Sequence, residues 1–190
     1  MTLTTIYFIR HAEPNSHNHD DFLRELTDKG LQDSKELVNL FSEILIDAVY
    51  SSPYKRAVDT ITPLALSKQK SIHLENDFRE RKITDKWIED FTSFTAKQWA
   101  DFSYRLEGGE SLSQVQNRNI QALEKVLQEH KGHTVVIGTH GTALSTIIQY
   151  YQPTFGLSDF QRVKHLFPWI VCLQFKGLSF QSLSEIPLKP

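Results

Sequence analysis

Two histidines each follow directly on an apolar segment of strand type. Residues 6–9 are β-branched or aromatic without a break, and Arg10 and His11 come next. A second run over residues 135–139 begins Val-Val-Ile and leads to His140. Such strands are typical of a sheet covered on both faces, and ligands of open α/β sheets bind beyond the carboxyl ends of the strands. We therefore expect Arg10, His11 and His140 at one rim of a sheet, although the first segment alone would equally fit a strand that leaves the core through a solvated Arg-His pair.

The residue types at this rim suit phosphoryl transfer. Between the two histidines, a strand end, a short loop and a helix start place Arg56 near the same rim. Arginine forks match phosphate oxygens, and backbone N–H groups at a helix start, here Gly141 and Thr142, favour an anion. A phosphoryl group in transfer spreads negative charge over its oxygens, so catalysis depends mainly on fixed donors. Arg10, Arg56 and His140 would supply those donors.

Taken together, these segments resemble the histidine phosphatase (phosphoglycerate mutase-like) superfamily. The matching pieces occur in the family's order and span residues 6 to about 145: Arg10-His11, Ser51-Ser52-Pro53 with Arg56, Glu80 within residues 78–81, residues 108–111, and Thr139-His140-Gly141. The resemblance implies that His11 is the nucleophile, attacks through a neutral ring nitrogen and forms a phosphohistidine. It also implies that Glu80 acts as general acid and then as general base. The expected catalytic residues are His11, Glu80, Arg10, Arg56 and His140, and the expected phosphate-binding residues are Arg10, His11, Arg56, His140 and Gly141.

The resemblance has departures that bear on the substrate. Ala12 follows the nucleophile where the family commonly has glycine, and His17 stands where asparagine is often found, with Asn18 one place later. The Gly-x-Trp that often follows the acid lacks its glycine here. Arg118 matches a family arginine, but a solvated helix face explains it equally well. We therefore make no assignment of phosphate contacts in the polar loop over residues 12–24.

A metal site is the main chemical alternative. It would be built on His11 and His140, together with His17, His19 or Asp20. The arginine that precedes His11 would repel a cation, and neither the HExxH motif nor zinc-type Cys/His spacings occur. We therefore expect no metal and no cofactor.

Two further alternatives concern activity. A catalytically silent module that binds a phosphorylated ligand would keep the arginines and could lose His11 or Glu80, yet both are present. Phosphoglycerate mutase-type transfer remains open, but mutases of this family are longer chains. We expect a phosphatase that hydrolyses a small phosphate monoester with one phosphate, and the aromatic residues that follow Glu80 also suit an apolar or ring-like substrate body.

Composition predicts an ordinary globular domain. The chain has 190 residues, of which 39% are hydrophobic and 23% charged, and its formal net charge is -2. Because the basic residues are dispersed, we expect a small-molecule substrate and neither nucleic acid nor membrane as partner. The single cysteine, Cys172, excludes an internal disulfide, and its apolar neighbours predict a buried, inert thiol. With no basic leader and no apolar run of ~20 residues, we expect a cytoplasmic protein, and we make no prediction of its oligomeric state.

The alternation of strand and helix patterns predicts a three-layer α/β/α fold with a mainly parallel sheet, in which the strands ending at Arg10 and Thr139 are adjacent and parallel. We expect helices capped by Thr27 and by Ser111, a third from about Tyr54 that Pro63 kinks or shortens, and a closing hairpin over residues 170–183. Residues 82–108 are rich in aromatic side chains and predict a small helical insertion that covers the site as a lid. A satellite hydrophobic cluster without a ligand role is the alternative. The whole chain, 1–190, is expected to form one domain.

Overall fold

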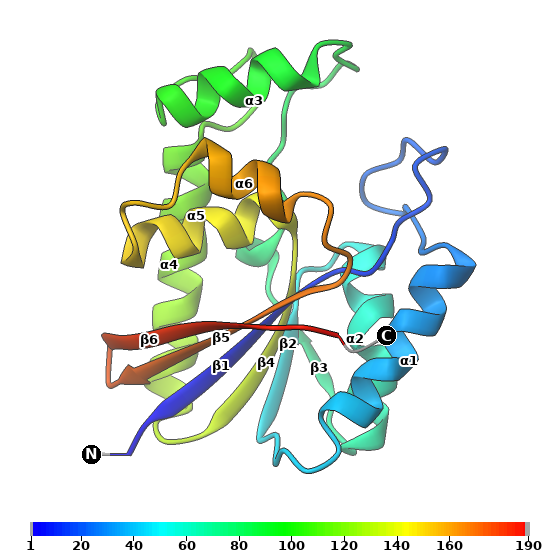
Figure 1. Cartoon of the computed structure of the whole chain (residues 1–190), viewed down its shortest axis with the longest axis vertical. Coiled ribbons are helices and arrows are strands. Elements are labelled where there is room, and N and C mark those ends of the chain that lie inside the picture. Colours follow the sequence, from blue (N-terminus) through cyan, green and yellow to red (C-terminus); the bar gives the residue numbers. More distant parts are fainter. Residues whose placement is uncertain (1, 189–190) are drawn as a thin grey trace.

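A six-stranded sheet forms the centre of the protein, in the order β3-β2-β4-β1-β5-β6 (Figure 1). The computed structural model describes residues 2–188. Its strands are β1 (Thr4–Arg10), β2 (Ala48–Ser51), β3 (Ile72–Leu74), β4 (Thr134–Thr139), β5 (Trp169–Lys176) and β6 (Ser179–Ile186). Its helices are α1 (Asp28–Leu40), α2 (Lys55–Ser67), the short 3-10 turn η1 (Asn76–Phe78), α3 (Phe91–Ala100), α4 (Leu112–Glu129), α5 (Gly141–Tyr151) and α6 (Leu157–Val163).

The two strands that end in functional residues pair with each other. β1 and β4 are parallel and in register from Thr5 opposite Thr134 to Arg10 opposite Thr139. β2 is parallel to β4 and to β3, whereas β5 and β6 run antiparallel and close the sheet as a hairpin. The predicted three-layer fold, with its adjacent parallel strands, is therefore confirmed.

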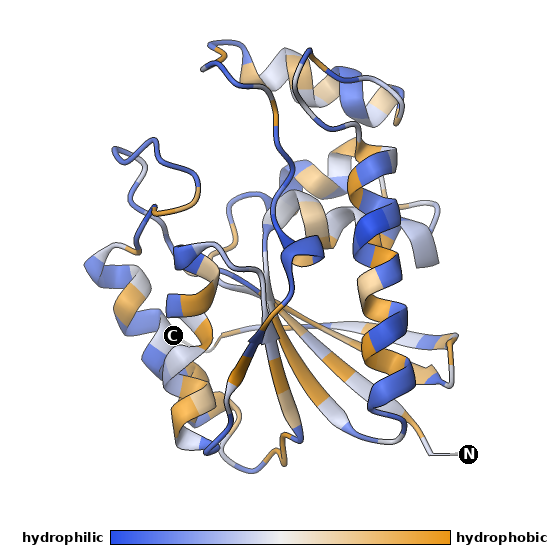
Figure 2. Ribbon diagram, turned by 180° about the vertical axis from the view of Figure 1, so that it is seen from behind, coloured by the Kyte–Doolittle hydropathy of each residue, from blue (hydrophilic) through white to orange (hydrophobic). Residues whose placement is uncertain are grey.

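Helices cover both faces of the sheet (Figure 1). On one face, Ile9 and Val136 of the sheet share a hydrophobic cluster with residues of α1 and α2. On the other face, Phe8 and Ile137 share a cluster with residues of α4 and α5. Figure 2 shows hydrophobic residues concentrated along the central strands and hydrophilic ones on the outer sides of the helices. Both faces of β1 and β4 are thus buried away from water, which explains the apolar runs in their sequences.

The helix starts follow the predicted capping chemistry. The Thr27 hydroxyl accepts the backbone N–H of Gly30 at the start of α1, and Ser111 with Gln114 forms a capping box at the start of α4. Pro63 lies inside α2 and does not end it, since the helix continues to Ser67. The buried apolar face of α2 offsets the one backbone hydrogen bond that proline removes.

The insertion over residues 82–108 contains one helix, α3, and is otherwise irregular. Its Trp99 packs on Phe160 of α6, with ring centroids 5.5 Å apart. The sequence did not predict α6, which lies between α3 and α5 (Figure 1).

Cys172 is buried in β5, and burial raises the pKa of its thiol, in agreement with the expected inert cysteine. Within residues 2–188, every helix is too short or too polar to cross a membrane.

Candidate active site

His11 lies just beyond β1 in a buried, neutral form. Its side chain is only 5% exposed, and its backbone N–H donates to the carbonyl of Thr139 at 3.0 Å. Its ring Nδ1 is 2.8 Å from the carbonyl oxygen of Ala12. Because a carbonyl can only accept, we assign the ring proton to Nδ1. Burial, followed by the cations of Arg56 and Arg10, holds the pKa of His11 well below its usual range, so Nε2 keeps its lone pair.

Arg10 is anchored by one end of its guanidinium. Nη1 donates to the carbonyls of Val163, Lys164 and Leu166 at 3.1, 3.0 and 3.1 Å, and Cζ lies 3.8 Å from the centre of the Phe167 ring. Nε is buried and has no hydrogen-bond partner among the described residues. Burial lowers the pKa of the Arg10 guanidinium to about 10, so it remains cationic at neutral pH. The Nε edge is therefore a fixed, positively charged donor.

Gly141, the first residue of α5, lets this arginine lie against the helix start. A Cβ atom at this position would lie 2.9 Å from both Cζ and Nε of Arg10. Real Cβ contacts are almost never that short, so any larger residue would displace the guanidinium. The glycine that the sequence assigns to phosphate binding therefore also has a steric reason to be there.

His140 is completely buried beside His11, with ring centroids 5.4 Å apart. Its Nε2 is 2.7 Å from the hydroxyl of Ser52, and its Nδ1 has no hydrogen-bond partner within residues 2–188. Burial and then the charge of Arg56 hold the pKa of His140 well below its usual range. The register of β1 and β4 thus places the two histidines side by side, as the sequence predicts, and burial keeps both imidazoles neutral.

Arg56 lies in the first turn of α2, as predicted, and is paired with a residue that sequence reasoning missed. Nη2 is 3.0 Å from the Asp21 carboxylate, and Nη1 donates to the Asp21 carbonyl. Asp21 belongs to the polar loop over residues 12–24. This loop also meets the insertion, where the rings of His19 and Trp87 stack with centroids 4.4 Å apart. The loop therefore contacts both Arg56, through Asp21, and the insertion, through His19.

The side chain of Glu80 lies at the N-terminal end of α5. Its carboxylate accepts the backbone N–H groups of Thr142 and Ala143, each at 3.1 Å, and that of Arg81 at 2.8 Å. In this structure the chain's own carboxylate accepts the Thr142 N–H, which the sequence offered to a bound anion. The same contact fixes Glu80 near Arg10. The charge of Glu80 raises the pKa of Arg10 and so offsets part of the lowering that burial causes.

Arg118 holds the segment that carries Glu80. Nη1 donates to the carbonyls of Asp77 and Arg79, both at 2.8 Å, and Nη2 donates to the Glu80 carbonyl at 3.2 Å. Its guanidinium also pairs with Glu110, with Nε 2.8 Å from a carboxylate oxygen. Arg118 is 9% exposed, so the alternative of a solvated helix face is wrong.

No group of three or more His, Cys, Asp or Glu side chains among residues 2–188 is placed to hold a metal ion. The histidines and aspartate that the metal alternative would recruit, His17, His19 and Asp20, are exposed in the polar loop. The arrangement at the rim is one of cationic and neutral donors around His11.

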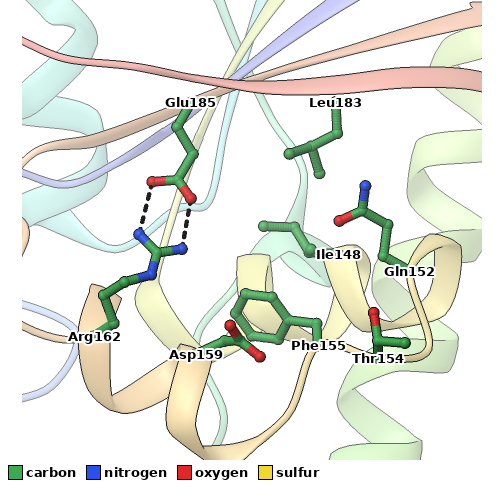
Figure 3. Close-up of a pocket in the computed structure, with 8 residues that line it drawn as sticks. All are labelled: Ile148, Gln152, Thr154, Phe155, Asp159, Arg162, Leu183 and Glu185. Atoms are coloured by element: carbon green, nitrogen blue, oxygen red, sulfur yellow. Dashed lines mark hydrogen bonds and ion pairs between the residues drawn. The ribbon is translucent and has the colours of Figure 1, made fainter.

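A separate cavity of about 210 Å³ lies between α5, α6 and β6 (Figure 3). Its most conspicuous charges, Arg162 and Glu185, pair in bidentate fashion at 2.6 and 3.1 Å. Trp169 also donates its ring N–H to Glu185 at 3.2 Å. Since these charges satisfy each other, the cavity offers no counterpart to the donors around His11.

Comparison with known proteins agrees with this geometry. A family model described as "Histidine phosphatase superfamily (branch 1)" matches residues 6–184. Phosphoserine phosphatase 1 of Hydrogenobacter thermophilus is 28% identical over 155 residues, covering 73% of this chain and 71% of that protein. The metal-independent phosphoserine phosphatase of Arabidopsis thaliana is 30% identical over 160 residues, covering 76% of this chain and 67% of that protein. The structure of YhfR from Bacillus stearothermophilus superposes with a TM-score of 0.80 at 25% identity and covers 94% of both chains. The chain therefore belongs to the histidine phosphatase superfamily (branch 1), the family and the phosphatase class of enzyme that its motifs predict.

Proposed function

We propose that the protein hydrolyses a small phosphate monoester through a phosphohistidine on His11. The observation that carries this proposal is the set of buried groups around that residue. His11 is neutral with Nε2 unprotonated, while Nε of Arg10 and Nδ1 of His140 are buried and unpartnered within residues 2–188. Buried polar groups are normally hydrogen-bonded, so donors left over beside a nucleophile favour an anionic substrate.

In the first step, Nε2 of His11 attacks phosphorus as the bond between phosphorus and the ester oxygen breaks. Glu80 in its protonated form gives its proton to the departing alkoxide. Arg10, Arg56 and His140 stabilise the charge on the phosphoryl oxygens. The products of this step are a free alcohol and phosphohistidine.

In the second step, water attacks the phosphohistidine while the Glu80 carboxylate accepts its proton. The bond between phosphorus and Nε2 breaks, inorganic phosphate leaves, and His11 returns to its neutral form. Because Nδ1 of His11 keeps its hydrogen bond to the carbonyl of Ala12, the imidazole does not rotate between the two steps. One carboxyl group thus serves as acid and then as base.

Arg56 requires an exchange of partners before it can contact phosphate. Its Nη2 now faces the Asp21 carboxylate. Two anions compete for the same guanidinium edge, so we propose that substrate phosphate takes the place of Asp21 there. Asp21 is about half exposed and can turn into solvent.

The names of two relatives, both phosphoserine phosphatases, make phosphoserine the first substrate to test. We would assay purified protein in EDTA with phosphoserine, 3-phosphoglycerate and an aryl phosphate. We expect release of inorganic phosphate without isomerisation, because arginines supply the positive field that a metal would otherwise provide. Isomerisation of phosphoglycerate would favour a mutase, loss of activity restored by zinc or magnesium would favour a metal enzyme, and binding without turnover would favour a silent module.

Glu80→Gln separates the proton-transfer role from substrate positioning. The variant keeps a side chain of the same shape but cannot donate a proton. Hydrolysis of an alkyl ester such as phosphoserine should therefore slow by about 10² to 10⁴, while an aryl phosphate with a good leaving group should be affected far less. Glu107→Gln, an exposed carboxylate of the insertion, is the matched control. Equal slowing of both esters would show that the proton comes from another group.

Gly141→Ala tests the fixed position of Arg10. The new methyl group would push the guanidinium aside, and a shift of about 1 Å at a reacting centre can cost about 100-fold in rate. We expect kcat/KM to fall by that order while the unfolding midpoint stays close to that of wild type. Gly156→Ala is the control, since a Cβ there meets its nearest atom only at 4.0 Å. Unchanged turnover in Gly141→Ala would contradict the proposed role of Arg10.

The lowered pKa values of the two buried histidines predict how their charge and the free energy of unfolding depend on pH. The pKa values of His11 and His140 lie well below 6.5 in the folded chain, so an NMR titration should show both rings neutral through that pH. The unfolded chain binds more protons below about 6.5, so the free energy of unfolding should fall as pH falls through that value, by at most about 1.4 kcal/mol per pH unit per histidine. Urea unfolding between pH 5 and 8 measures this slope, and His11→Gln should reduce it. Protonation of either ring near pH 6.5 in the folded protein would refute the assignment.

A further inference from the structure

We infer that Ser52 is a positioning residue that donates its hydroxyl proton to Nε2 of His140 and thereby keeps the proton of that ring on Nδ1. The inference rests on the proposed function, because it assigns the nitrogen with which His140 would contact the phosphoryl group. Nδ1–H would be a hydrogen-bond donor for a phosphoryl oxygen, whereas the other tautomer would present a lone pair to it.

The sheet fixes the position of Ser52. Its backbone N–H donates to the carbonyl of Gly138 at 2.9 Å, which ties the end of β2 to β4. Both Ser52 and His140 are completely buried, and the Oγ to Nε2 distance is 2.7 Å. No bulk water competes for this contact, so the pair is well placed to select one arrangement of protons.

A count of donors and acceptors gives the direction of the hydrogen bond. The Ser52 hydroxyl has one proton, and its oxygen already accepts the backbone N–H of Tyr54 at 3.2 Å. Nε2 of His140 is the acceptor within reach of that proton among the described residues. If Nε2 carried its own proton, the hydroxyl oxygen would accept it with its second lone pair, and the buried hydroxyl proton would then have no acceptor among the described residues. The neutral ring therefore has its proton on Nδ1, which is also buried and has no partner within residues 2–188.

Neighbouring aromatic rings limit rotation of the His140 imidazole. The Tyr54 ring packs edge-on against His140 with centroids 5.2 Å apart, and His11 lies at 5.4 Å. With the ring orientation fixed, the hydrogen bond between Nε2 and the Ser52 hydroxyl determines the tautomer. In metal sites, partners that orient a ligating histidine in this way typically contribute about 10- to 100-fold, and we expect the same order here.

The test compares two adjacent buried serines. Ser52→Ala removes the donor to His140, whereas Ser51→Ala removes a hydroxyl that is equally buried and has no hydrogen-bond partner among the described residues. ¹⁵N NMR of the His140 ring reports the tautomer, and turnover of an aryl phosphate reports catalysis. We expect Nδ1–H in wild type and in Ser51→Ala. In Ser52→Ala we expect loss of that single tautomer, with kcat lower by about 10- to 100-fold.

Two results would overturn the inference: a wild-type His140 with its proton on Nε2, or a Ser52→Ala variant that matches Ser51→Ala in tautomer or in kcat. The wild-type NMR measurement decides the tautomer even if Ser52→Ala fails to fold. Ser52→Thr, which retains a hydroxyl, should restore the Nδ1–H signal. Failure of the proposed function would appear differently, as absence of phosphate release by wild type, and would leave the NMR result intact.

Discussion

The parallel pairing of β1 with β4 is the constraint on which the site depends. Arg10 lies opposite Thr139 in this pairing, so the residues that follow, His11 and His140, must leave the sheet side by side. A shift of one residue in either strand would send its histidine to the other face of the sheet. The two apolar clusters that cover the strands oppose such a shift, because it would expose buried side chains. Burial of the sheet is thus the physical origin of the geometry at the rim.

Main-chain groups then hold the charged side chains in place. Carbonyls at the end of α6 and just after it hold Arg10, carbonyls around η1 hold Arg118, and the start of α5 holds Glu80. Removing Arg10 from water is costly, and its carbonyl partners compensate without neutralising its charge. A carboxylate partner would have cancelled the positive field that a phosphoryl group needs. Arg56 and Arg118 differ from Arg10, since Asp21 faces Arg56 and Glu110 pairs with Arg118.

Sequence reasoning succeeded where a side-chain pattern reports directly on burial. The unbroken apolar runs before Arg10 and His140 predicted both the central strands and the rim, and Ser111 with Gln114 predicted a helix start. It failed where backbone atoms make the contact. Carbonyls at the end of α6 and just after it hold Arg10, and because every residue has a carbonyl, the residue types there do not indicate this contact. The Asp21 contact depends on the path of a loop, which composition does not specify. Arg118 was ambiguous since periodicity cannot distinguish a buried, hydrogen-bonded arginine from a solvated one.

The most direct test of the account is to trap the enzyme during turnover and locate the phosphoryl group. Rapid quenching under alkaline conditions, followed by mass spectrometry and ³¹P NMR, would identify both the residue and the ring nitrogen. Because Nδ1 of His11 is bonded to the carbonyl of Ala12, the account predicts phosphate on Nε2 of His11 and none in His11→Ala. Phosphate on Nδ1, on another residue, or turnover that persists in His11→Ala would contradict it.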